Sequence, residues 1–154
     1  MYRPLLSLTM MLALFFAGCG DRNEFMAYAD VESSGWAYGD TLSFVTEIDD
    51  SHAAGTLDVN VRHNSDYLFQ NLWLEVTYNN SSSLCRDTVN IRLADKYGNW
   101  LGDGFGPRYQ TSVRVADHVV MADSALVSVR HIMRVDTLRC VEQIGITFTP
   151  SSTK

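Results

Sequence analysis

The sequence lacks any apolar run long enough to span a membrane, and it lacks an excess of positive charge. Its most apolar stretch, residues 5–16, is much shorter than the roughly 20 residues that a membrane-spanning helix needs. The 154 residues include 12 Lys and Arg against 18 Asp and Glu. An acidic chain of this kind argues against nucleic acid as a partner and against attraction to anionic lipid headgroups by charge.

Motifs for catalysis or metal binding are also missing. The histidines are scattered, with no His-x-x-x-His pair, and there is no Gly-x-Ser-x-Gly turn. One of them, His63, falls on the apolar side of a predicted strand. A histidine in such a place is more often a hydrogen-bonded core residue than a ligand. The sequence therefore predicts a non-enzymatic protein with no metal site and no cofactor.

What the sequence does contain begins with an export signal. Arg3 supplies positive charge, residues 5–16 supply the apolar segment, and the order Phe-Ala-Gly leads to Cys19. Small residues before a single cysteine resemble a bacterial lipobox, so residues 1–18 are predicted to be a lipoprotein signal peptide. Cys19 is then the lipidated first residue of the mature chain, where two or more acyl chains give stable anchoring. The alternative is a secreted protein in which this cysteine is incidental.

Cysteine is otherwise rare, since only Cys85 and Cys140 follow Cys19. In an exported chain these two either form a disulfide or remain as buried free thiols. A bridge would close a loop of about 55 residues and stabilise the fold by roughly 4 kcal/mol. The sequence leaves both alternatives open.

Apolar and polar residues alternate with a period of two over most of the chain after residue 40. The alternation is strict in residues 56–63 (TLDVNVRH) and 71–78 (NLWLEVTY). Further strands are predicted over residues 41–48, 84–93, 111–116, 125–135 and 144–149. Residues 125–135 could also form a helical stripe, but their β-branched content favours a strand. About seven short strands predict an all-β fold, an antiparallel β-sandwich spanning residues 41–154 as a single domain.

Residues 19–40 precede this pattern. They mix charged residues, Ser and Gly with scattered aromatic residues and show no sustained period. They are predicted to form a lipidated tether between membrane and domain, with the far part packed on the domain.

The most unusual stretch is the glycine-rich segment of residues 95–109, DKYGNWLGDGFGPRY. Its glycines are expected to adopt positive φ at several positions, with Trp100 and Phe105 folded back into the core. The alternative is a surface for a partner or ligand, formed by Asp95, Gly98, Trp100, Gly102, Asp103, Gly104 and Phe105. Oxygen atoms of Asp95, Asn99 and Asp103 are also spaced as a Ca²⁺ site could use them, although such residues commonly just form turns.

Trp73 is a second candidate for a surface contact. It alternates with Leu72 and Leu74, so it is predicted to point away from the core. An outward tryptophan suits a protein contact or stacking on a sugar ring. Two functions are therefore weighed: an interaction protein, and a lipoprotein that binds carbohydrate or peptidoglycan.

Several short motifs follow one another over nearly the whole mature chain. They are the lipobox ending at Cys19, Trp36 before residues 40–44 (DTLSF), 64–67 (NSDY), 71–74 (NLWL), 94–95 and 98–106 (GNWLGDGFG), 133–134, Leu138 and 144–146. In this order they resemble the GldH family, the gliding-motility lipoproteins of Bacteroidetes-type bacteria. The Trp-Leu-Gly-x-Gly-x-Gly stretch is the most specific of them.

The resemblance implies a cell-envelope lipoprotein that supports surface gliding and the associated protein-secretion machinery, with no enzymatic activity and no cofactor. It assigns a role to one residue, Cys19, whose lipid holds the domain at a membrane. The expected location is the periplasmic face of the outer membrane, because Gly20 stands where some inner-membrane lipoproteins have a retaining aspartate. The expected partners are envelope proteins of a motility and secretion machine.

Overall fold

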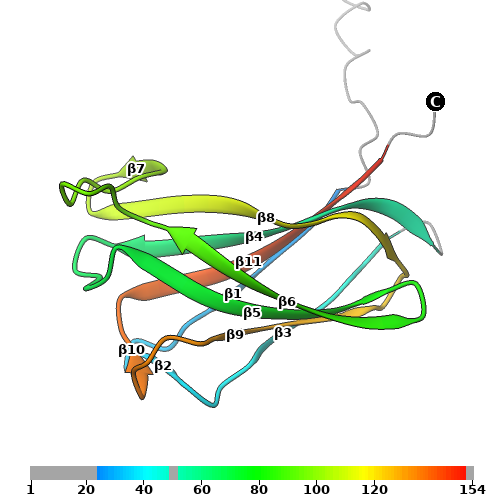
Figure 1. Cartoon of the computed structure of the whole chain (residues 1–154), viewed down its shortest axis with the longest axis horizontal. Helices are drawn as coiled ribbons and strands as arrows, with labels where there is room; N and C mark the ends of the chain where they lie inside the picture. Colours follow the sequence, from blue (N-terminus) through cyan, green and yellow to red (C-terminus); the bar gives the residue numbers. More distant parts are fainter. Residues whose placement is uncertain (1–23, 49–51, 152–154) are drawn as a thin grey trace, which may run out of the picture.

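The computed structural model describes residues 24–48 and 52–151, which form two antiparallel sheets facing each other (Figure 1). The five-stranded sheet has the order β1 (Phe25–Asp30), β11 (Val141–Pro150), β4 (Ala53–Asn64), β8 (Arg108–Met121), β7 (Asp103–Phe105). The four-stranded sheet has the order β3 (Leu42–Val45), β9 (Leu126–His131), β5 (Asn71–Asn80), β6 (Ser83–Arg92), and β2 (Trp36–Ala37) pairs with β10 (Thr137–Leu138). The predicted all-β sandwich is confirmed.

The alternation of apolar residues decides which face of each strand is buried. The centre of the core comes from β4 and β5, where six alternating residues are fully buried: Leu57, Val59, Val61, Leu72, Leu74 and Val76. Each such side chain stabilises the fold by roughly 1.5–3 kcal/mol relative to an exposed one. Within the described residues, no helix is long and apolar enough to cross a membrane.

The domain begins earlier than residue 41, so the predicted boundary between tether and domain is wrong. β1 pairs with β11 over its whole length, from Phe25 opposite Phe148 to Asp30 opposite Gln143. The sequence concealed this strand because its inward positions after Phe25 are alanines, which carry little hydrophobic signal. The predicted signal peptide, residues 1–18, and the lipidated Cys19 lie outside the described residues.

Other strands differ from the prediction mainly in length. Residues 125–135 contain a strand and not a helix, but β9 ends at His131. β8 extends well beyond the predicted residues 111–116 at both ends. The short strands β2, β7 and β10 were not predicted, since two or three residues are too few to show a period.

Cys85 and Cys140 are free, half-buried thiols at opposite ends of the sandwich. Cys85 lies near the β5–β6 turn, which is hydrogen-bonded to β8 beside the start of β4. The carbonyl of Cys140 instead accepts a hydrogen bond from Asn64, the last residue of β4. A strand of this length puts the two thiols on the order of 30 Å apart, whereas a disulfide needs Cα atoms within about 7 Å. The disulfide alternative is therefore wrong for this fold.

The two ends of the sandwich differ. We call the end where β1 begins the N-terminal end, and the opposite end the far end. The N-terminal end contains the start of β1, the β5–β6 turn and the start of β9. The far end contains Asp30, the end of β4, and the segments 65–70 and 93–102. Figure 1 shows β7, β10 and β2 gathered at this far end.

Candidate functional site

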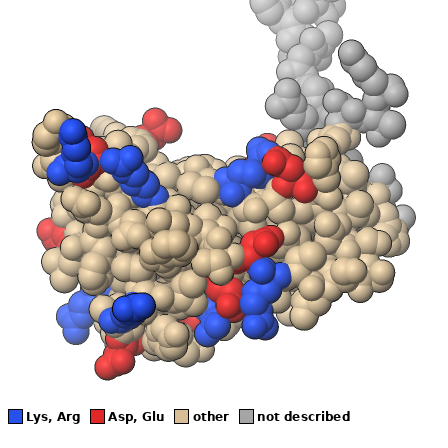
Figure 2. Space-filling view, viewed as in Figure 1, with Lys and Arg blue, Asp and Glu red and all other residues tan. Residues whose placement is uncertain are grey.

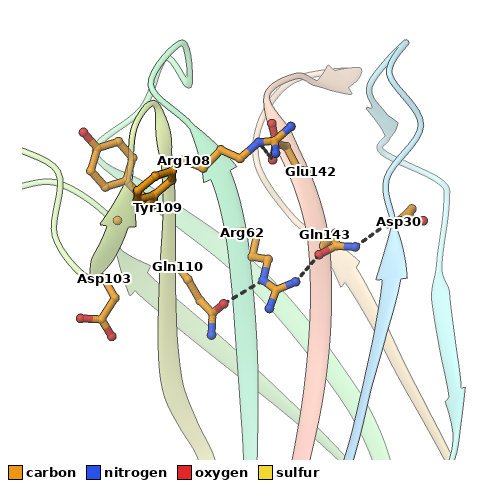
Figure 3. A pocket seen from close by; sticks show the side chains of 10 residues that line it. Asp30, Arg62, Asp103, Arg108, Tyr109, Gln110, Glu142 and Gln143 are labelled. Carbon is orange, nitrogen blue, oxygen red and sulfur yellow. Dashed lines mark hydrogen bonds and ion pairs between the residues drawn. The ribbon is translucent and has the colours of Figure 1, made fainter.

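A row of polar side chains crosses the outer face of the five-stranded sheet at its far end (Figure 3). Strand register aligns Asp30, Gln143, Arg62, Gln110 and Asp103, one from each strand. Gln143 donates a hydrogen bond of 2.6 Å to Asp30. Arg62 donates through Nη1 to the Gln143 side-chain oxygen at 2.6 Å and through Nε to that of Gln110 at 2.7 Å. The side chains of Asp30, Gln143, Arg62 and Gln110 are thus fixed by one another before any ligand arrives.

Arg62 is held by neutral groups. Its guanidinium carbon lies 4.2 Å from the centre of the Tyr28 ring, a cation–π contact. The ring lies against Gly145, where a Cβ atom would come within 2.5 Å of it, so glycine is what lets tyrosine lie flat on β11. Within residues 24–48 and 52–151, no carboxylate forms an ion pair with Arg62.

The row forms the floor of an open groove of about 730 Å³. Phe105 stands at its rim with 93% of its surface exposed, so the expectation that Phe105 folds into the core is wrong. The reason is a two-residue hairpin turn between β7 and β8, with Gly106 at φ +61°, which directs Phe105 outward beside Asp103. A β-bulge at Glu142 turns that residue toward Arg108, with 3.1 Å between carboxylate and guanidinium (Figure 3).

Trp100 packs inward behind this groove and is half-buried. Its ring lies 4.7 Å from that of His63 and 5.9 Å from that of Tyr109. His63 is fully buried, as expected, and its Nδ1 donates to the Asn64 carbonyl at 3.0 Å. Burial lowers the pKa of His63, so the ring is neutral and serves as part of the core.

Asp95 and Asn99 form a turn. The Asp95 carboxylate accepts hydrogen bonds from the backbone N–H groups of Tyr97 and Asn99 and from the Asn99 side-chain amide, at 2.8, 2.9 and 2.9 Å. The Asn99 side-chain bond, followed by the backbone bonds, lowers the pKa of Asp95. Asp103 belongs to the row in the groove instead, so the three oxygen-bearing residues considered for Ca²⁺ serve two different structures.

The glycines of the segment adopt the expected conformations. Gly98, Gly102 and Gly106 all have positive φ. Gly102 is also pressed against β8, since a Cβ atom there would lie 2.2 Å from the Gln110 carbonyl oxygen. Gly104 faces the Tyr109 ring across the β7–β8 hairpin.

Trp73 points outward as predicted, with 40% of its surface exposed. It lies at the far end of the four-stranded sheet, opposite Asn90 of β6, so it is on the other side of the sandwich from the groove. Nearby on this outer face, Glu75 accepts a hydrogen bond of 2.8 Å from Arg130. The structure therefore separates Trp73 from Asp103 and Phe105.

Several groove residues were not singled out from the sequence: Asp30, Arg62, Arg108, Gln110, Glu142 and Gln143. The alternation in β4 puts Arg62 on the outer face, but it gives no reason to distinguish this residue from other solvent-facing residues. Only the register of five strands reveals the row. On the face shown in Figure 2, positive and negative side chains of the described residues lie close together, without a broad patch of one sign.

Fold and site together define a class of protein, an antiparallel β-sandwich that presents a hydrogen-bonded polar groove at one end. Comparison with known sequences gives the family. A model of the family described as GldH lipoprotein matches residues 23–148, and the chain belongs to this family. It is accordingly a lipid-anchored lipoprotein of the cell envelope.

Two relatives carry names that indicate motility. The chain is 26% identical over 125 residues to "Gliding motility lipoprotein GldH homolog" of Christiangramia forsetii, covering 79% of this chain and 75% of that protein. It is 30% identical over 97 residues to "Gliding motility lipoprotein GldH" of Flavobacterium johnsoniae, covering 62% of this chain and 60% of that protein. The chain is thus a motility-associated lipoprotein.

Among solved structures, one similar chain is the Eiger TNF from S. frugiperda, with a TM-score of 0.38 and 10% identity. The alignment covers 86% of this chain and 97% of that one. A second is an exo-beta-1,3-galactanase from Phanerochaete chrysosporium, with a TM-score of 0.37 and 11% identity, covering 82% of this chain and 27% of that one.

Proposed function

We propose that this chain is a non-enzymatic lipoprotein of the outer membrane that supports gliding motility and the associated protein-secretion machinery through protein contacts. The lipid on Cys19 holds it at the periplasmic face. The far end of the sandwich then presents its surface to envelope proteins of that machinery.

The observation that supports this role is the meeting of separate family motifs at the far end. The rings of Tyr67 and Trp100, from the NSDY and glycine-rich motifs, lie 6.4 Å apart. The backbone N–H of Trp73 donates to the sulfur of Met133 at 3.3 Å, which joins two further motifs. Loops at the end of a rigid sandwich are a common place for binding residues.

The length of chain before β1 supports the same orientation. Phe25, where β1 begins, is the sixth residue after Cys19, so an extended chain between them reaches at most about 21 Å. The N-terminal end of the sandwich must then lie close to the bilayer. The 12 residues of β4 extend about 36 Å from there toward the far end, which favours contacts away from the membrane.

Site-specific photocrosslinking in living cells tests this proposal. A photoreactive amino acid replaces Tyr97, which is 78% exposed at the far end, or Leu126, which is 51% exposed at the N-terminal end. We expect defined crosslinks to envelope proteins from position 97 and none from position 126. Defined crosslinks from position 126 alone would refute the proposed orientation, and none from either position would refute the protein-contact role.

The matched control for anchoring is Cys19→Ala. This variant should leave the membrane fraction and lose the crosslinks from position 97. If Cys19→Ala stays in the outer-membrane fraction, Cys19 is not the lipidated residue.

A further inference from the structure

We propose that the groove on the five-stranded sheet binds a glycan strand, an oligosaccharide of pyranose rings that lies across the strands along the polar row. This inference goes beyond the protein-contact role and does not depend on it. It is based on the alignment of hydrogen-bonding groups, on the exposed ring of Phe105 and on the charge of the groove.

The row offers the mixture of donors and acceptors that sugar hydroxyls require. Carboxylates at the two ends, Asp30 and Asp103, are acceptors, while Arg62 retains guanidinium donors beyond the two it uses. The free amide group of Gln110 is also a donor, because the oxygen of this side chain is bound to Arg62. A hydroxyl both donates and accepts, so it can be satisfied anywhere along such a row.

The spacing of the row also suits a chain of sugars. Adjacent strands lie about 4.8 Å apart, so the five aligned side chains extend over about 19 Å. This spacing is close to the length of one pyranose unit in an extended glycan. The groove, at about 730 Å³, is within the size range of small-ligand sites.

Phe105 provides the apolar part of such a site. It is exposed at the rim with no stabilising role in the core, at the tip of a hairpin whose turn fixes its direction. An aromatic face packs well on the C–H face of a sugar ring, which also has an apolar side. A large exposed aromatic beside a polar row is the arrangement that a glycan would use.

The charge of the groove favours a neutral ligand over an ionic one. Arg108 is paired with Glu142, and Arg62 is fixed by amide oxygens between the carboxylates of Asp30 and Asp103. These two positive and three negative groups leave no strong excess of either sign. An extended peptide fits less well, because the floor is made of side chains and offers no strand edge for backbone pairing.

Titration calorimetry of the lipidated protein in a non-glycosidic detergent tests the inference. The probes are chitotetraose, cellotetraose and maltotetraose. We expect saturable binding of at least one of them, weakened about tenfold by Phe105→Ala and about tenfold by Gln110→Ala. Phe105→Tyr, which keeps the ring, should restore most of the affinity.

Leu68→Ala is the matched control, since Leu68 is 85% exposed at the same end but does not line the groove. It should bind the same sugar with unchanged affinity. The inference is overturned if none of the three sugars binds, or if Phe105→Ala and Leu68→Ala bind equally well. Neither of those results would alter the expected crosslinks from position 97, so the two proposals fail separately.

Discussion

Two glycines in the same segment provide a sharp test of how this fold is held together. Gly98 and Gly102 both have φ +86°, a conformation that L-residues rarely adopt. They differ in their surroundings, because a Cβ atom at Gly98 meets nothing within 4 Å. At Gly102 it would lie 2.2 Å from the Gln110 carbonyl oxygen and 2.6 Å from Thr111 Oγ1. An alanine at each position therefore separates backbone strain from steric clash.

The expected magnitudes follow from this difference. Gly98→Ala should lower the free energy of unfolding only by the cost of the left-handed conformation, about 1–2 kcal/mol. Gly102→Ala carries the same cost and must also move the carbonyl oxygen of Gln110, which is fixed because β8 pairs with β4 and β7 at that residue. We expect about 2–5 kcal/mol for Gly102→Ala, since clashes of this kind add a further 1–3 kcal/mol.

Thermal unfolding followed by circular dichroism measures both variants. For a domain of this size, 1 kcal/mol corresponds to a Tm change of about 4 °C. Gly98→Ala should then melt about 4–8 °C below the parent protein, and Gly102→Ala about 8–20 °C below it. Equal Tm values for the two variants would refute the close contact between the glycine-rich segment and β8.

Two further predictions concern acid stability and the thiols. Burial lowers the pKa of both His63 and His131 below the ordinary 6.5, so the unfolded chain takes up protons near pH 6.5 while the fold resists them. The stability contributed by the two neutral histidines should therefore be complete above about pH 6.5, and the free energy of unfolding should fall as the pH drops toward the folded pKa values. Urea unfolding that is unchanged down to pH 5 would contradict this. Because Cys85 and Cys140 are free, a thiol assay on the unfolded, unreduced protein should count two reactive groups, and a count of zero would show that they are bridged.

The core could be predicted from the sequence because it depends on a local pattern. Strict alternation in β4 and β5 identified their buried residues and the outward direction of Trp73 without reference to any other strand. Glycine density likewise predicted positive φ at Gly98 and Gly102. In each case, the information lies within a few neighbouring residues.

The groove could not be predicted because it depends on pairing between distant parts of the chain. Asp30 and Gln143 are 113 residues apart in the sequence and meet only because β1 pairs with β11. On its own strand, each residue of the polar row is an ordinary outward polar residue. Phe105 was misplaced for a local reason, since the Gly-Pro hairpin turn that exposes it lies in a glycine-rich segment for which the sequence predicts no strand.

The register that buries the core is also the register that builds the row. In β4, Val61 and His63 point inward and are fully buried, while Arg62 between them points outward. A slip of one residue against β11 or β8 would turn Arg62 into the core and expose its neighbours, which the buried face forbids. The packing of the core therefore already places Arg62 beside Gln110 and Gln143, so the hydrogen bonds among them do not have to stabilise the register. Core packing provides the alignment, and the outer face is free to carry the chemistry of recognition.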